Sequence, residues 1–514
     1  MEKEGTFVRN LGKLLFRRVV LISLGIALQL CAMVFFLEEL ALVRPWFQGV
    51  MLILRVGFVL YLAAARMDAS YKVAWLFLIL VFPVAGVSIY LFMGGNRVSF
   101  REKKRLSAVT HCTEEHLRQD FAVKNALLNE SPSAAKQSGY LQKNAYSPVY
   151  ADTETEYFSC GEDFFPRMLQ ELEKAEQFIF LEYFIVEDGY LWGKILSILK
   201  EKAAHGVDVR LIYDDFGCIT RLPARYPRYL RDFGISVRVF NPFLPIVSGR
   251  LNNRDHRKIL VIDGKVGFTG GMNLADEYMN RGSRFGYWKD AGLLLKGSAV
   301  HSMTVQFLSM WDFVSKQTSD VESFRMQNDG DGCGFVQPFT DSPLDNESVG
   351  QTALLNLIAG AQKTLYIMTP YLVLDDCLTT ALCNSAKSGV DVRIITPGVP
   401  DKWYVYSVTR FSYRTLTEAG VKIYEFSPGF LHSKVFLADG ETAVVGTVNL
   451  DYRSLYLHFE NAVWMHKSDC LQAIRADFET TFPLCRMVDK ETVRKTPCLV
   501  RLGRAILNLF APMM

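Results

Sequence analysis

The sequence predicts an α/β protein of two tandem domains related by pseudo-twofold symmetry, preceded by transmembrane helices. Three observations lead to this prediction. One polar motif occurs twice with identical spacing, a longer repeat surrounds it, and the first hundred residues are far more apolar than the rest. The chain has 514 residues, which is enough for a membrane segment and two domains of ordinary size.

The repeated motif has the form H-x-K-x4-D-x6-G-x2-N. Its histidine, lysine, aspartate and asparagine positions are His256, Lys258, Asp263 and Asn273 in the first copy, and His432, Lys434, Asp439 and Asn449 in the second. So many specified positions in one register do not arise by chance. The copies are about one domain length apart. We therefore expect one active site assembled from two half-sites.

The repeat extends beyond the motif. GVDVR occurs at residues 206–210 and again at 389–393, and in each copy it precedes a helix, a short strand and then the motif. In each copy Asp-Gly follows an apolar strand, which predicts a hairpin turn. Two copies indicate a tandem duplication and not a solenoid. We expect the first domain at 150–330 and the second at 335–514, after a polar, irregular linker at 98–149.

The membrane segment is expected at residues 1–97. Residues 19–37 and 73–93 contain no charged side chain, and each is long enough to span a hydrocarbon core of roughly 30 Å. Residues 46–65 are a third candidate in spite of Arg55, which costs about 2.5–3.5 kcal/mol on insertion scales. A cleaved signal peptide is the weaker alternative for residues 19–37, because no small-residue cleavage site follows them.

The orientation in the membrane stays open. Basic residues lie both before the first apolar segment and after the last, so the positive-inside rule places both flanks in the cytoplasm. That placement needs an even number of crossings, whereas three apolar segments give an odd number. We expect a multi-pass protein whose catalytic domains are cytoplasmic.

Charge and cysteine content exclude other classes. The net charge of +3 is too small to indicate a nucleic-acid partner. The ten cysteines are scattered and contain no C-x-x-C pair, which argues against a zinc ribbon and a disulfide scaffold. The chain also lacks a P-loop signature, and we expect no metal and no cofactor.

The motif residues suggest a reaction at phosphorus. On a strand, residues two apart project to the same face, so each histidine projects with its lysine. If the two units pack together, two ammonium groups and the amides of Asn273 and Asn449 form a site for a phosphate diester. One imidazole can attack in line while the other moves protons. The lysines supply the charge, so this chemistry needs no metal ion.

Two further carboxylates are candidates for orienting the histidines. Asp290 follows the first hairpin and Glu460 follows the second, each just before an apolar run. A histidine nucleophile needs an acceptor on its other nitrogen. Asp263 and Asp439 are included with the catalytic residues, although a turn-capping role is the alternative for both.

Several segments together resemble bacterial cardiolipin synthases of the phospholipase D superfamily. They are RDHRK (254–258), GFTGGMN (267–273), WKD (288–290), FLH (430–432) and GTVNLDYRS (446–454). The spacing of Trp75, Pro83, Gly86 and Tyr90 is also similar. The resemblance covers the chain from about residue 46 to its end. Residues 19–37 look like an addition to the usual two-helix membrane hairpin.

The resemblance implies two phospholipase D-like α/β sandwich domains and a phosphatidyltransferase of the bacterial inner or plasma membrane. Such enzymes join two phosphatidylglycerol molecules into cardiolipin and release glycerol through a phosphohistidine. The nucleophile role is carried over to His256 and the acid/base role to His432, although the motif alone also allows the reverse. No nucleotide is implied, and the oligomeric state stays open.

Two other functions remain as alternatives. A lipid hydrolase or nuclease would use the same pocket with water or DNA, but the weak net charge and the apolar segments count against DNA. An inactive, membrane-anchored binding protein would keep only the fold. Two complete motifs argue against it, because a protein that has lost its activity would be expected to lose a motif histidine or lysine first.

Overall fold

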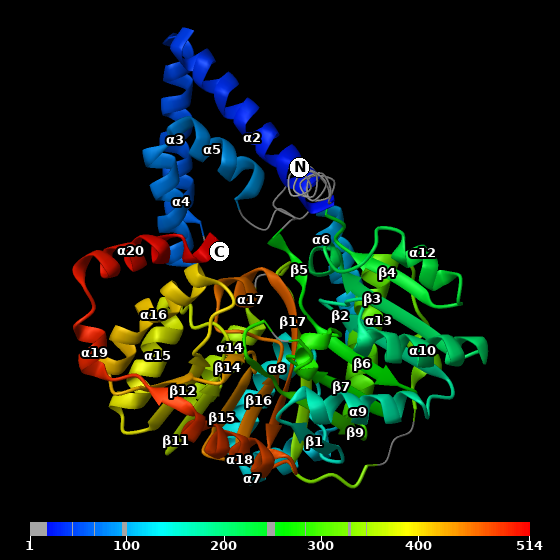
Figure 1. Ribbon diagram of the computed structural model, residues 1–514. Helices are drawn as coiled ribbons and strands as arrows, with labels where there is room; N and C mark the ends of the chain where they lie inside the picture. Colours follow the sequence, from blue (N-terminus) through cyan, green and yellow to red (C-terminus); the bar gives the residue numbers. More distant parts are fainter. Residues whose placement is uncertain are drawn as a thin grey trace, which may run out of the picture.

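The computed structural model describes residues 18–43, 45–65, 67–94, 100–243, 252–282, 284–326, 330–345 and 347–513. Four apolar helices near the N-terminus project from one side of an α/β body (Figure 1). The body contains one large mixed sheet from each half of the chain. Their arrangement confirms the prediction of two α/β domains.

The first sheet has seven strands in the order β1-β9-β7-β6-β2-β3-β4. These strands are β1 (Glu154–Phe158), β2 (Phe178–Tyr183), β3 (Asp208–Asp214), β4 (Ser236–Phe240), β6 (Lys258–Ile262), β7 (Val266–Gly270) and β9 (Gly292–Lys296). Strands β2, β3 and β4 run parallel, and the other neighbours are antiparallel. Every residue of β2 and β6 is buried, as expected for central strands covered on both faces.

The second sheet repeats this order as β10-β17-β16-β15-β11-β12-β13, with β18 added at one edge. Its strands are β10 (Phe335–Asp341), β11 (Thr364–Met368), β12 (Asp391–Pro397), β13 (Lys422–Phe426), β15 (Val435–Ala438), β16 (Thr442–Gly446), β17 (His458–His466) and β18 (Cys485–Met487). Because the equivalent strands have the same order, the repeat read from the sequence is a duplication of the whole sheet. Strand β10 begins at the residue where the second domain was expected to start.

Helices cover both sheets. In the first half they are α9 (Gly161–Leu172), α10 (Tyr190–Ala204), α11 (Asp215–Cys218), α12 (Tyr226–Arg231) and α13 (Ala299–Ser315), with the short turns η2 (Asp276–Met279) and η3 (Val321–Phe324). In the second half they are α14 (Val349–Gly360), α15 (Asp376–Lys387), α16 (Trp403–Glu418), α17 (Tyr452–Tyr456), α18 (Leu471–Thr481), α19 (Lys490–Arg494) and α20 (Cys498–Leu509), with η4 (Phe482–Leu484) and η5 (Ala511–Met513).

One core is shared by the two domains. It combines side chains of both sheets with those of the buried helix α13 and of α18, as in the cluster that contains Phe180, Phe307 and Val445. The outer faces of the sheets pack against their own helices in two further cores. The two domains are therefore one packed body.

The segment 98–149, which we expected to be an irregular linker, contains three helices. They are α6 (Phe100–His116), α7 (Phe121–Glu130) and α8 (Pro132–Asn144). Within this segment the sequence Ser-Pro-Ser (131–133), which by composition is typical of a loop, is a helix start: the Ser131 hydroxyl accepts the amide of Ala134 at 3.2 Å, and Pro132 lies in the first turn. Leu141 packs into the core of the second domain. These helices are part of the folded body.

The apolar N-terminal helices are α2 (Arg18–Val43), α3 (Pro45–Ala64), α4 (Ala69–Val81) and α5 (Pro83–Met93). The prediction of one continuous span at 73–93 is wrong, because the chain leaves the helix at Phe82 and starts a new one at Pro83. Proline has no amide hydrogen for a helix interior and restricts the residue before it. By length and composition, Trp46–Ala64 is the helix within the described residues that could cross a membrane.

Candidate active site

Two short strand pairs connect the domains and bring the half-sites together. Strand β5 (Arg254–Asp255) runs parallel to the start of β17, with Asp255 opposite Phe459. Strand β14 (Gly429–Leu431) runs parallel to β8 (Tyr287–Lys289), with Leu431 opposite Lys289. The next residue on one strand of each pair is a motif histidine, and the next on the other is a carboxylate. Each histidine therefore meets a carboxylate of the opposite domain.

The carboxylates hold the imidazoles through Nδ1. The two carboxylate oxygens of Glu460 lie 3.0 and 2.9 Å from Nδ1 of His256. An oxygen of Asp290 lies 2.6 Å from Nδ1 of His432. When Nδ1 carries the proton and donates it to the carboxylate, Nε2 keeps its lone pair for chemistry. The structure thus brings both expected orienting residues to the histidines, in crossed pairs.

Both motif lysines are buried beside their histidines. The ammonium of Lys258 donates to the carbonyl of His256 at 2.6 Å, and Lys434 donates to the carbonyl of His432. Burial lowers the pKa of Lys258 to about 7 and that of Lys434 to about 8. The charge of Lys434 further lowers the pKa of Lys258, so the half-sites interact electrostatically. A bound anion would restore the charge on both lysines.

The two histidine–carboxylate pairs differ in charge. Burial opposes ionisation of Glu460, but its interaction with His256 holds its pKa well below the usual range. Burial raises the pKa of Asp290 to about 7, against the opposing effect of Lys434. Burial lowers the pKa of His256 to about 3 and that of His432 well below its usual value. Glu460 is therefore a fixed anion beside a neutral imidazole, whereas Asp290 titrates near neutrality.

Two hydroxyl groups that the sequence analysis missed account for part of this difference. Ser454 donates to Glu460 at 2.6 Å, and Thr447 donates to its other oxygen. In the first motif, Gly271 stands in the register of Thr447, and a Cβ there would lie 2.1 Å from an oxygen of Asp290. Asp290 therefore lacks the corresponding hydroxyl. In the sequence, the replacement of Thr447 by Gly271 at the same position of the repeat is the signal for this difference.

The two motif asparagines are not equivalent. The carbonyl of Asn273 accepts the amide of Ile185 at 3.0 Å, and its NH2 group donates to the Tyr278 hydroxyl at 2.6 Å. The side-chain oxygen of Asn449 is buried and has no hydrogen-bond partner within the described part of the chain. Asn273 thus supports the neighbouring backbone, and a substrate-binding role fits Asn449 better. That role stays a prediction for both.

Asn461 is a further residue that the sequence analysis missed. Its side-chain oxygen accepts the amide of Lys258 at 3.0 Å, and its NH2 group donates to the Thr269 hydroxyl at 2.8 Å. Since Asn461 follows Glu460 directly, one tight segment of β17 orients the histidine and the lysine of the opposite domain.

Asp263 and Asp439 were expected among the catalytic residues, but the structure gives them a different place. Each lies at a hairpin turn with a positive φ, of 51° and 56° respectively. Each carboxylate accepts three consecutive backbone amides before a central strand, those of Glu176, Gln177 and Phe178 for Asp263 and those of Gln362, Lys363 and Thr364 for Asp439. These contacts lie at the far end of β6 and β15 from the lysines, so the structure gives both carboxylates a turn-capping role.

Comparison with known proteins agrees with this geometry. The domain family described as "Cardiolipin synthase, PLD-like domain" matches residues 168–311 and 354–482. A cardiolipin synthase of Geobacillus sp. is 36% identical over 87% of this chain and 89% of its own. Cardiolipin synthase 2 of Bacillus cereus is 32% identical over 89% of both chains. An uncharacterized protein of Streptococcus mutans is 43% identical over 89% of this chain and 100% of its own.

Among solved structures, phosphatidylserine synthase of Haemophilus influenzae has a similar fold. The TM-score is 0.55 at 15% identity, and the match covers 74% of this chain and 100% of that one. At this identity the likeness supports the two-domain fold alone. The matched domain family and the similarity along most of the chain show that the protein belongs to the bacterial cardiolipin synthase family of the phospholipase D superfamily.

Proposed function

We propose that the protein is a cardiolipin synthase, which transfers a phosphatidyl group from one phosphatidylglycerol to another and releases glycerol. The observation that carries the proposal is the crossed pair of histidines: each is held through Nδ1 by a carboxylate of the other domain, beside a buried lysine. Such a site has two imidazoles for proton and phosphoryl transfer and two cations for a phosphate diester.

In the first step, Nε2 of His256 attacks the phosphorus of the donor lipid. A P–N bond forms, and the bond from phosphorus to the headgroup glycerol oxygen breaks. His432 gives a proton to this oxygen, and glycerol leaves. The anion of Glu460 stabilises the positive charge that develops on His256, which favours His256 as the nucleophile. Asp290, whose pKa burial raises to about 7, helps to keep a proton in its pair with His432 at neutral pH.

In the second step, the terminal hydroxyl of another phosphatidylglycerol attacks the phosphohistidine. His432 accepts the hydroxyl proton, a new P–O bond forms, and the P–N bond to His256 breaks. Cardiolipin leaves, and the histidines return to their starting states. Because one phosphodiester replaces another, the reaction needs no nucleotide and no cofactor. Lys258 and Lys434 neutralise the phosphate charge in both steps.

We further propose that the site works at a bacterial inner or plasma membrane, which the apolar N-terminal helices support. In our proposal α3 crosses it together with α2, whose residues 19–37 contain no charged side chain, whereas α4 and α5 fold back on each other at Pro83. Two crossings leave both basic flanks on the cytoplasmic side, together with the catalytic domains. Helix α20 lies beside these helices (Figure 1). Its exposed apolar side chains suit the membrane interface; they are Leu499, Val500, Leu502 and Ile506.

A lipid assay tests the proposal. The full-length protein in detergent is incubated with phosphatidylglycerol labelled at phosphorus, and the lipids are separated, with His256→Ala as the control for contaminating activity. We expect cardiolipin and glycerol in equal amounts. Phosphatidic acid as the main product would show a hydrolase instead, and no turnover would show a binding protein.

The reverse reaction gives an independent check. The reaction replaces one phosphodiester by another, so its standard free energy is close to zero. The concentrations of the lipids and of glycerol therefore set the direction of the reaction. Cardiolipin with excess glycerol should yield phosphatidylglycerol. Failure of this reversal in a preparation with forward activity would contradict a transfer that releases glycerol.

A further inference from the structure

A third imidazole lies against the nucleophile. His458 precedes Glu460 by two residues on β17, and its ring centroid is 5.6 Å from that of His256 at an interplanar angle of 42°. Trp288 precedes Asp290 by two residues and lies 5.4 Å from His432 at 44°. The two half-sites therefore hold different rings at the same place. An indole cannot bind a metal ion through its nitrogen, whereas an imidazole can.

Neither ring nitrogen of His458 has a hydrogen-bond partner among the described residues, although both nitrogens are buried. Its Nδ1 lies 3.7 Å from an oxygen of Glu460, which is beyond hydrogen-bond distance. Buried polar groups in proteins nearly always have a partner, so this imidazole calls for one that the described residues do not supply.

The surroundings form a ligand set for a metal ion. His256, His458 and Glu460 each offer one ligand atom, and these atoms lie within 4.8 Å of one another. Zinc bonds of about 2.0–2.1 Å in a tetrahedron place ligand atoms about 3.3 Å apart. From one and the same oxygen of Glu460, Nδ1 of His256 lies 3.0 Å away and Nδ1 of His458 lies 3.7 Å away, on either side of this value. Two histidines and one glutamate are a known zinc-binding combination.

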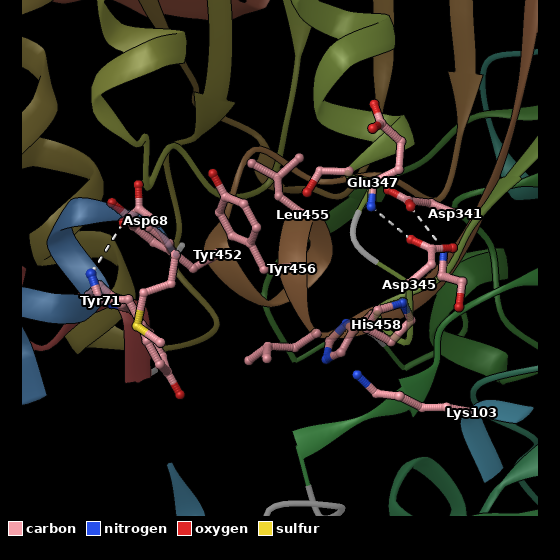
Figure 2. A pocket seen from close by; sticks show the side chains of 16 residues that line it. Asp68, Tyr71, Lys103, Asp341, Asp345, Glu347, Tyr452, Leu455, Tyr456 and His458 are labelled. Atoms are coloured by element: carbon pink, nitrogen blue, oxygen red, sulfur yellow. Dashed lines mark hydrogen bonds between the residues drawn. The ribbon is translucent and has the colours of Figure 1, made fainter. Parts of the chain in front are cut away.

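A cavity leads to His458. Its volume is about 550 Å³, and it lies between the first turn of α4, the end of β10, α17 and η5 (Figure 2). Four carboxylates and one ammonium line it together with His458; they belong to Asp68, Asp341, Asp345, Glu347 and Lys103. Burial raises the pKa of Asp341 to about 8, and the neighbouring carboxylate of Asp345 raises it further. Such walls favour a divalent cation over an anion.

We propose that His256, His458 and Glu460 bind one divalent transition-metal ion of the zinc type, and that this ion inhibits the enzyme. The ion takes the place of the proton on Nδ1 of His256 and occupies the oxygens that orient this imidazole. It also adds positive charge beside Lys258, and it withdraws electron density from the nucleophilic nitrogen. We expect water to fill the fourth position of the ion and to reach it through the cavity that His458 lines.

Metal binding is measured first, without lipid. The full-length protein is freed of metal with a chelator and titrated with zinc by calorimetry, and with cobalt by its visible absorption. The variants are His458→Phe, which keeps a ring, and His458→Asn. The control is His205→Asn, an exposed histidine at the end of α10. We expect one ion per chain in the wild type and in the control, and affinity at least about tenfold weaker in both His458 variants.

Inhibition is measured second, with the lipid assay. Zinc should stop turnover in the wild type, a chelator should restore it, and each His458 variant should need at least about tenfold more zinc for half-inhibition of its own metal-free rate. Equal zinc affinity in wild type and both variants, or binding without inhibition, would overturn the proposal. The inhibitory role rests on the proposed function of His256, but the binding titration does not, so the two can fail separately.

Discussion

Glu460 of the second domain holds His256 of the first, with both carboxylate oxygens about equally far from Nδ1, at 3.0 and 2.9 Å. His432 and Asp290 form the reciprocal pair at 2.6 Å. Neither domain therefore contains a complete histidine–carboxylate pair of its own. The duplication produced two half-sites that depend on each other, and the residues around the two carboxylates make the halves chemically different.

The hydroxyl of Ser454 should set the acid side of the pH–rate profile. It donates to the anion of Glu460 at 2.6 Å, and a hydrogen bond to a charged group is worth about 1.5–3 kcal/mol. Removing it in Ser454→Ala should raise the pKa of Glu460 toward its usual range, because the anion loses a hydrogen bond. As the pH is lowered, Ser454→Ala should lose its activity at a higher pH than the wild-type protein does. The measurement is turnover against pH, with Ser468→Ala, a buried serine elsewhere, as the control. Overlapping profiles would contradict this role.

Lys258 and Lys434 should each be needed for turnover and not for folding. Each presents a buried charge where the phosphate would bind, and one strong electrostatic donor is worth a rate factor of about a hundred or more. Lys258→Met and Lys434→Met should lose at least that factor with normal circular dichroism. Lys387→Met, which is exposed at the end of α15, is the control. If a variant folds and keeps near-normal turnover, the lysine that it lacks is not part of the site.

The two histidines should differ in trapping experiments. With lipid labelled at phosphorus, His432→Asn should accumulate label on His256. The variant lacks the base that would activate the incoming hydroxyl, so the phosphohistidine is resolved slowly. His256→Asn should accumulate none. Peptide mapping must avoid acid, since phosphohistidine is acid-labile. Label on His432 in the His256→Asn protein would reverse the roles. No label in active wild-type protein quenched early would indicate direct transfer between two bound lipids.

Asp263 and Asp439 should affect stability and not chemistry. Each carboxylate accepts three backbone amides at a hairpin turn, so Asp263→Ala or Asp439→Ala leaves these donors without their partner. We expect a loss of about 1.5–3 kcal/mol or more, seen as a lower Tm. Turnover per folded molecule should stay within a few-fold of wild type. A normal Tm with abolished turnover would restore both residues to the catalytic set.

Chelators should not reduce activity. The lysines supply the positive charge that a metal ion would otherwise supply at the phosphate. Cardiolipin formation is measured with and without EDTA at matched ionic strength, because charged lipid surfaces respond to salt. Activity that disappears with EDTA and returns with one particular divalent ion would contradict the proposed chemistry.

Much of the fold was predictable because its signals are local. The spacing shared by the segments around His256 and His432 predicted a duplication, and both sheets have the same strand order. The break at Pro83 and the helix start at Ser131 were also visible in the sequence. Composition alone points the other way, because the apolar residues around Pro83 favour one span and Ser-Pro-Ser is typical of a loop. Capping and backbone geometry decide such cases.

The sequence by itself determined the α/β class, the duplication, the placement of each lysine beside its histidine, and the four residues that form the crossed pairs. Only the tertiary structure decided how those residues pair and which half-site receives Thr447, Ser454 and His458. His256 and Glu460 are 204 residues apart, and His432 and Asp290 are 142. Which strand edges meet over such separations depends on how two sheets bury a shared core, and no local periodicity records it.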